Sequence, residues 1–136
     1  WNYMMSIDTP ASKKFAKNFK KRWGADRVVA DPQESAYNMV YLWKQAVEDA
    51  GTFDDNAVRE ALVGQKFDAP QGPVEVMPNH HLSQTVRIGQ INAEGGFTIL
   101  EETGVVLPQA WNQKHPSSKG FACDWTDPSK GEKYKL

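Results

Sequence analysis

The sequence predicts an α/β fold, built as a short apolar strand, three helices and a β-rich end. Up to about residue 62, apolar residues recur at helical spacing between helix-start and helix-stop signals. From residue 72 onward they alternate with polar residues, as in strands with one buried face. The composition, 40% hydrophobic and 24% charged, is that of an ordinary globular domain. A strand that leads into a helix is typical of an α/β layer.

The first predicted unit is a strand over residues 2–7 followed by a helix. Thr9 and Pro10 form a helix start, because a hydroxyl caps free N–H groups and proline fits the first helical position. Gly24 supplies the left-handed stop. The apolar stripe of this helix consists of Phe15, Phe19 and Trp23.

The second predicted helix has the strongest start signal in the chain. Asp31 is predicted as its cap, Pro32 as its first residue, and Glu34 as the side chain that reaches back toward the cap. The helix is expected to run to Ala50 and to end at Gly51.

Residues 36–43 of that helix are apolar on almost every face. A helix of this kind is normally buried on most sides. It therefore needs neighbours on several sides, and we expect uncovered faces to pair with another copy of the chain.

The remaining elements are shorter. Asp54 or Asp55 is predicted to cap a third helix that ends at Leu62, before Gly64. The predicted strands cover residues 72–77, 85–92 and 97–101, with a hairpin-like turn at 93–96.

The chain divides into two predicted regions. Residues 1–107 form the α/β part, and residues 108–136 form an irregular tail rich in polar residues, proline and glycine. The single cysteine, Cys123, lies in this tail. It is predicted to be a free or partly buried thiol, although a partner cysteine in a longer chain stays open.

Composition and motifs exclude several classes of function. A net charge of −1 and a pI near 6.3 lack the basic footprint of a nucleic-acid-binding protein. No apolar run approaches the length of a membrane span. No phosphate-binding loop, dinucleotide fingerprint, nucleophile elbow or zinc-protease motif is present. We therefore expect neither an enzyme nor a cofactor, and name no catalytic residue.

Two polar clusters are candidate functional sites. His80 and His81 are adjacent, and neighbouring residues of a strand point to opposite faces, so they chelate poorly and are predicted to form a loop without metal. Asp26, Asp31 and Glu34 gather before the second helix. They are read as capping and surface charge, or as the polar rim of a cleft.

Several segments together resemble one known family. They are Tyr3-Met4-Met5-Ser6-Ile7-Asp8-Thr9-Pro10, Glu34-Ser35-Ala36-Tyr37, Phe67-Asp68-Ala69-Pro70-Gln71-Gly72-Pro73-Val74, Asn79-His80-His81-Leu82 and Cys123-Asp124-Trp125. In this order they are similar to the type I periplasmic binding proteins of the branched-chain amino acid and amide group, in particular to the urea-binding components.

This resemblance implies two α/β lobes joined by three crossovers, with the solute held between them. The chain would be the last third of such a protein, crossing at the second helix and recrossing near Gly72 and Pro73. Tyr3, Gln33 and Glu34 are the residues expected near the solute, although core packing is the competing reading of Tyr3. Most direct contacts would come from earlier residues, so this segment alone is expected not to bind urea.

The implied function is binding of urea or a short amide by hinge closure, followed by docking on the membrane permease of an ABC transporter. The protein would be periplasmic or extracellular and attached to the cell envelope. Two alternatives stay open. One is an amide-sensing regulator of the same fold, and the other is a free-standing protein-interaction domain.

Overall fold

The computed structural model describes residues 1–109; the remainder of the predicted tail, with Cys123, lies outside that range. Three helices precede an antiparallel four-stranded sheet whose strands lie in sequence order. The elements are α1 (Pro10–Trp23), α2 (Asp31–Ala50), α3 (Asp55–Leu62), β1 (Lys66–Ala69), β2 (Gly72–Val76), β3 (Leu82–Ile91) and β4 (Phe97–Val106).

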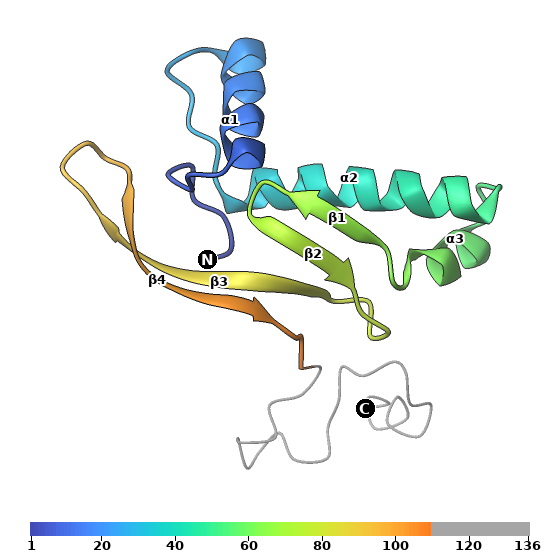
Figure 1. Cartoon of the computed structure of the whole chain (residues 1–136). Helices are drawn as coiled ribbons and strands as arrows, with labels where there is room; N and C mark the ends of the chain where they lie inside the picture. Colours follow the sequence, from blue (N-terminus) through green and yellow to red (C-terminus); the bar gives the residue numbers. More distant parts are fainter. Residues whose placement is uncertain (110–136) are drawn as a thin grey trace, which may run out of the picture.

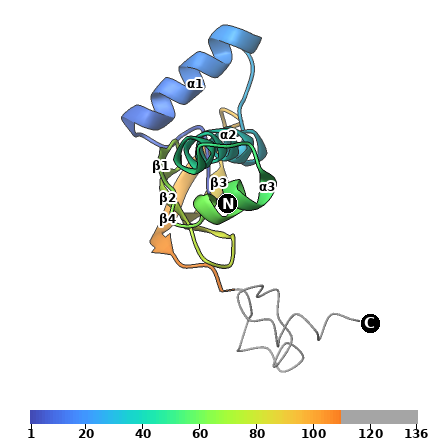
Figure 2. The ribbon, with the colours of Figure 1, turned by 90° about the vertical axis from the view of Figure 1, so that its right-hand side faces the viewer.

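Helix α2 is the centre of the arrangement (Figure 1). It lies along β1 and β2, with α3 folded back beside its end. Helix α1 stands above the start of α2, and the sheet lies below it, which the turned view also shows (Figure 2). The long β3–β4 hairpin extends past the other elements on one side.

Local signals place the ends of all three helices. The Thr9 hydroxyl accepts a hydrogen bond from the Ser12 N–H at 3.1 Å and so caps α1. Gly51 adopts the left-handed conformation after α2, with φ of 63°. The Asp54 carboxylate caps α3 by accepting from two backbone N–H groups. These contacts confirm the predicted helices. Gly24, however, ends α1 with φ of 124° and ψ of 143°, which is not the αL conformation predicted for it.

Two apolar clusters form the core. The first consists of Tyr3, Ile7, Phe15 and Val29, and joins α1 to the segment before it. The second consists of Leu42, Ala69, Val74 and Val76, and joins α2 to β1 and β2. Tyr37 connects the two clusters, because its ring lies 4.7 Å from that of Phe15 and 6.1 Å from that of Phe67.

The prediction of a strand over residues 2–7 is wrong in this structure. Trp1 exchanges two backbone hydrogen bonds with Arg87 of β3, as paired strand residues do. The next two N–H groups, of Asn2 and Tyr3, donate to the Asp31 side chain instead of to a neighbouring strand. The segment is therefore extended but leaves the sheet after one residue.

The sheet also differs from the prediction in its details. Strand β1 was not predicted, because its four residues alternate too briefly to give a pattern. It pairs with β2 across the two-residue turn Pro70–Gln71. Both hairpin strands are longer than predicted, and β3 and β4 stay paired through two register shifts.

The apolar stretch of α2 is only partly covered. Leu42 and Ala46 face β1 and β2 and are buried. Met39, Val40 and Trp43, by contrast, are at least half exposed within the described part of the chain. These three residues are called the α2 stripe below.

Candidate functional site

The first residues of the chain, the start of α2 and strand β3 meet around Asn2. Its N–H donates to Asp31 Oδ1 at 3.0 Å, and its carbonyl accepts from Arg87 Nη1 at 2.6 Å. The Asn2 side chain donates to the Thr85 carbonyl at 2.8 Å. Tyr3 N–H adds a second bond to Asp31 Oδ1 at 2.6 Å. We call this set of contacts the Asn2 junction. It fixes the first residues of the chain to the start of α2 and to β3.

Arg87 carries the charge of the junction on the sheet side. Its side chain is only 5% exposed, and its Nε donates to Glu102 Oε2 at 2.6 Å. A buried guanidinium requires hydrogen-bond acceptors for its donors, and here they come from Glu102 and the Asn2 carbonyl. The junction is thus built from charge-assisted bonds, which are among the stronger hydrogen bonds in proteins.

A second buried polar cluster lies one helical turn further along α2. Glu34, Asn38 and Gln71 are almost completely buried. Glu34 Oε1 accepts from Asn38 Nδ2 at 2.8 Å and from the Gln71 N–H at 3.1 Å. This Glu34 cluster joins α2 to the turn between β1 and β2. Gln71 Nε2 extends it to Gln84 Oε1 on β3, at 3.3 Å.

The electrostatic environment of Glu34 favours its neutral form. Burial raises the pKa of the Glu34 carboxyl above its usual range, and the hydrogen bonds from Asn38 and Gln71 only partly oppose this. The Asp31 carboxylate raises the pKa further, while the Arg87 guanidinium lowers it.

The three predicted site residues are placed differently from one another. Tyr3 is 1% exposed, with its ring edge-on to Phe15 at 5.6 Å, so core packing describes most of its contacts. Its phenol accepts a bond from the Ser12 hydroxyl at 3.4 Å, and burial raises the pKa of that phenol. Glu34 lies in the same polar interior, close enough to add to that shift. Their contact with a solute stays a prediction.

Gln33, and not Glu34, makes the side-chain contact expected at the start of α2. The side chain that reaches back to the start of α2 is that of Gln33, whose Oε1 accepts from the Ala30 N–H at 3.2 Å. Gln33 is exposed and separate from the buried cluster. Asp31, the predicted cap, bonds to Asn2 and Tyr3 instead. The capping roles predicted for Asp31 and Glu34 are therefore wrong, because long-range partners compete for both carboxylates.

An open pocket of about 390 Å³ lies beside Tyr3. It lies between the first residues, the link before α2 and the turn of the β3–β4 hairpin. Its walls include Tyr3, Met4, Val29, Asn92 and Phe97. Tyr3 is the one predicted site residue that lines it. The lining is mainly apolar, with the Asn92 amide as a polar group.

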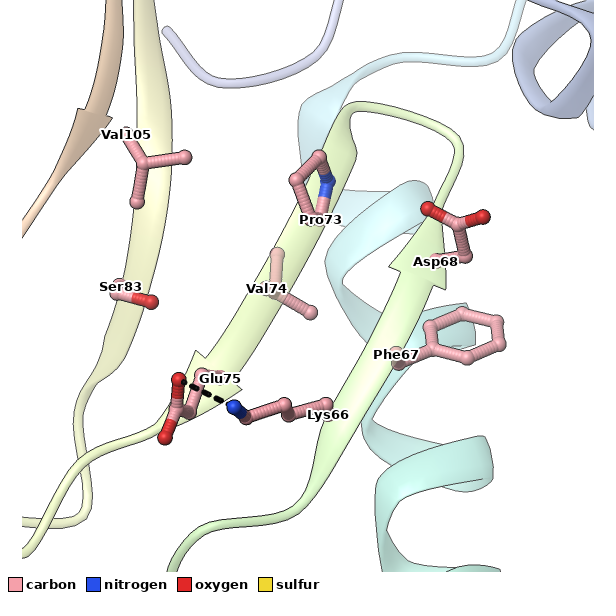
Figure 3. Close-up of a pocket in the computed structure, with 8 residues that line it drawn as sticks. All are labelled: Lys66, Phe67, Asp68, Pro73, Val74, Glu75, Ser83 and Val105. Atoms are coloured by element: carbon pink, nitrogen blue, oxygen red, sulfur yellow. Dashed lines mark ion pairs between the residues drawn. The ribbon is translucent and has the colours of Figure 1, made fainter.

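A second pocket, of about 440 Å³, lies on the sheet (Figure 3). Figure 3 shows Lys66 of β1 reaching across to Glu75 of β2, a pair whose charged atoms are 3.5 Å apart. Both side chains are well exposed, so this pair contributes little to stability. Ser83 and Val105 complete the wall on the hairpin side.

Metal ligands do not gather in the described range. Within residues 1–109 there is no group of three or more histidine, cysteine or carboxylate side chains placed to hold an ion. His81 Nδ1 lies 2.9 Å from the Asn79 carbonyl, and both histidines belong to the loop between β2 and β3. The same range contains no helix that is both long and apolar enough to cross a bilayer.

Comparison with known proteins then places the chain. The model of the family described as "periplasmic binding protein domain" matches residues 1–117. The chain belongs to this family. A solute-binding protein of an ABC transporter from Rhodopseudomonas palustris, solved with 3,4-dihydroxybenzoic acid, superposes on 78% of this chain with a TM-score of 0.67 and 20% identity. This likeness confirms the predicted type I periplasmic-binding-protein fold.

Curated relatives of this periplasmic binding protein domain carry two kinds of name. Leu/Ile/Val-binding protein homolog 6 of Brucella abortus is 27% identical over 93 residues, 67% of this chain. A protein of Geobacillus stearothermophilus named limonene hydroxylase is 31% identical over 107 residues, 79% of this chain. The second name is that of an enzyme and weakly conflicts with the expectation of a non-enzyme.

The chain spans only part of these proteins. It covers 24% of the Brucella protein, 20% of the Geobacillus protein and 30% of the solved Rhodopseudomonas chain. The chain thus spans less than a third of the length of each of these relatives.

Sequence reasoning missed Arg87 and Gln71 as partners of the junction and the cluster. One signal was available for Arg87, because it follows Thr85 at the two-residue spacing of a buried strand face. No comparable signal marks Gln71, whose backbone N–H is what Glu34 binds.

Proposed function

We propose that this chain is part of the solute-binding component of an ABC transporter, and that its solute is urea or a short amide. The observation that carries the first half is the family match over residues 1–117. On this proposal the protein is not an enzyme, and it lies outside the cytoplasmic membrane, attached to the envelope. Its partner is the membrane permease of the transporter.

The solute is proposed from the sequence segments that resemble urea- and amide-binding members. They are Phe67–Val74, Asn79–Leu82 and the segment that begins at Tyr3. The solved relative was crystallised with a dihydroxybenzoic acid, and the Brucella relative is named for leucine, isoleucine and valine. Members of the family thus bind chemically different solutes, and the proposal of an amide rests on the segments alone.

The mechanism we propose is hinge closure over the solute. A solute shifts the population toward the closed form only by binding that form more tightly. The Asn2 junction is suited to a pivot, because it joins segments distant in sequence through short bonds to the backbone of one residue. Whether the chain recrosses near Gly72 and Pro73 stays a prediction; these residues begin β2 directly after the tight turn.

The α2 stripe also supports a larger protein. Met39, Val40 and Trp43 present apolar surface that is at least half exposed among the described residues. Surfaces of this kind usually mark an interface with another chain or another part of the same chain. On the proposal, preceding parts of a longer chain cover the stripe, and the isolated chain self-associates through it.

Val40→Lys tests that use of the stripe. In light scattering, the wild-type chain is expected to show concentration-dependent association, and the variant to weaken it by about tenfold or more, since burying a valine contributes roughly 1.5 kcal/mol. Asn18→Lys adds the same charge on the exposed side of α1 and is expected to change nothing. A wild-type chain that is monomeric and cooperatively folded at every concentration favours a free-standing interaction domain instead.

The proposed solute is tested by selectivity. A longer chain that contains these residues would be heated with urea, formamide, acetamide, benzoate or leucine present in turn. Ligands that bind only the folded state raise the melting temperature by mass action. We expect urea or one of the amides to give the largest rise. A rise with benzoate or leucine alone contradicts the proposed solute but leaves the solute-binding function intact.

A further inference from the structure

The Glu34 cluster has more acceptors than donors. Glu34 Oε2, Asn38 Oδ1 and Gln71 Oε1 are all buried, and none has a hydrogen-bond donor among the described residues. Asn38 Nδ2 donates to Glu34 Oε1 and Gln71 Nε2 donates to Gln84 Oε1, and neither nitrogen donates to any of these three oxygens. Buried polar atoms in native proteins almost always have partners.

Reversing an amide does not repair the cluster. If the Asn38 amide were turned, its oxygen would face Glu34 Oε1, which is itself an acceptor. If the Gln71 amide were turned, its oxygen would face Gln84 Oε1 in the same way. Turning the amides therefore gives the three unpartnered oxygens no donor, and a donor has to come from another hydrogen.

We infer that Glu34 is a neutral carboxylic acid in the folded protein, at pH values at which the exposed glutamates are already ionised, and that its Oε2–H supplies one of the donors which this cluster lacks. One proton then removes a buried charge and turns Oε2 from an unpartnered acceptor into a donor, so that at most one of the two amide oxygens gains a partner from it. The consequence is a pH-sensitive joint between α2 and the β1–β2 turn, because both sides are held through this carboxyl.

The charged groups around Glu34 agree with a neutral acid. Asp31, on the same helix, disfavours a second negative charge, and Tyr3 faces Glu34 with a phenol that is itself buried. Arg87 on β3 favours the carboxylate. The hydrogen bonds of its side chain, however, go to Glu102 and to the Asn2 carbonyl and not to Glu34. Burial outweighs the attraction of this cation and raises the pKa of Glu34.

The sign of the pH effect follows from linkage. The folded state holds the Glu34 proton more tightly than the unfolded state does. The stabilisation from this group is complete below the unfolded pKa and is lost as pH rises through the folded pKa. Across that window the folding equilibrium constant falls by up to about tenfold per pH unit, and then levels off.

The test compares the wild-type chain with Glu34→Gln, whose side-chain amide supplies a permanent donor in place of Oε2–H. Guanidinium unfolding would be measured between mildly acidic and mildly basic pH. The variant is expected to lack the decrease that the wild type shows, and to be at least as stable at the basic end. Glu60→Gln, on the exposed side of α3, is the matched control and should keep the wild-type pH dependence.

The titration of the Glu34 carboxyl carbon, followed by NMR in the wild-type chain, gives a direct second readout that needs no variant. A titration shifted well above that of the exposed glutamates supports the inference. An ordinary or lowered titration overturns it, as does a Glu34→Gln variant that is less stable at every pH while the wild-type slope is retained. In that outcome the carboxylate is charged and a bound water supplies the donors.

Discussion

Replacing Phe15 by alanine should cost the folded chain about 3–5 kcal/mol, the usual range for removing a buried aromatic ring. Phe15 is the buried apolar side chain of α1. Its ring lies against Tyr3 on one side and against Tyr37 of α2 on the other. Guanidinium unfolding measures the loss, and amide exchange along residues 10–23 should show α1 opening first.

Phe53→Ala is the matched control. Phe53 is 76% exposed and touches mainly Trp43, so its removal should cost less than about 1 kcal/mol. If both variants lose similar stability, α1 is not anchored through Phe15 and the first core cluster is misassigned.

Replacing Asp31 by alanine should cost about 3 kcal/mol. One carboxylate oxygen accepts from both the Asn2 and the Tyr3 N–H groups, and a hydrogen bond to a charged group contributes roughly 1.5–3 kcal/mol. Because Asp31 is partly exposed, solvent reduces the expected loss of stability below the sum of the two hydrogen-bond contributions. Unfolding gives the global loss, and amide exchange at Asn2 and Tyr3 shows whether the junction itself has opened.

Two further variants separate the junction from a general charge effect. Asp31→Asn keeps an acceptor oxygen and is expected to lose roughly half as much. Asp26→Ala removes an exposed carboxylate nearby and should change stability by less than about 0.5 kcal/mol. Unchanged exchange at Asn2 and Tyr3 in Asp31→Ala would show that this carboxylate does not hold the first residues.

The helices could be predicted because their signals are local. Thr9 and Pro10 start α1, Gly51 ends α2 and Asp54 caps α3, each through contacts within a few residues. The hairpin between β3 and β4 was equally accessible, since alternation and a glycine-containing turn lie within one short stretch.

The start of the chain and the polar interior could not be predicted in this way. Asn2 and Tyr3 bond to Asp31, which lies 29 and 28 positions further along the chain. Glu34 bonds to the backbone of Gln71, 37 positions away. Capping chemistry assigned Asp31 and Glu34 correctly to a helix start, but their partners depend on tertiary packing that sequence spacing does not encode.

The proposed site shows the same division. Tyr3, Gln33 and Glu34 were selected together because the resemblance places them near the solute. In the structure Tyr3 and Glu34 lie in the buried interior, while Gln33 caps a helix on the outside. The structure thus separates the three residues by burial, and whether any of them contacts the solute stays a prediction.

Calorimetric titration with urea tests the central claim most directly, when it is carried out on this 136-residue chain and on a longer chain that contains it. The account predicts saturable heat of binding for the longer chain, with urea or a short amide, and no detectable binding for this chain alone. Micromolar binding of urea to this chain alone would contradict it, because the pocket would then lie within these residues. Failure of the longer chain to bind any small solute would contradict the proposed function itself.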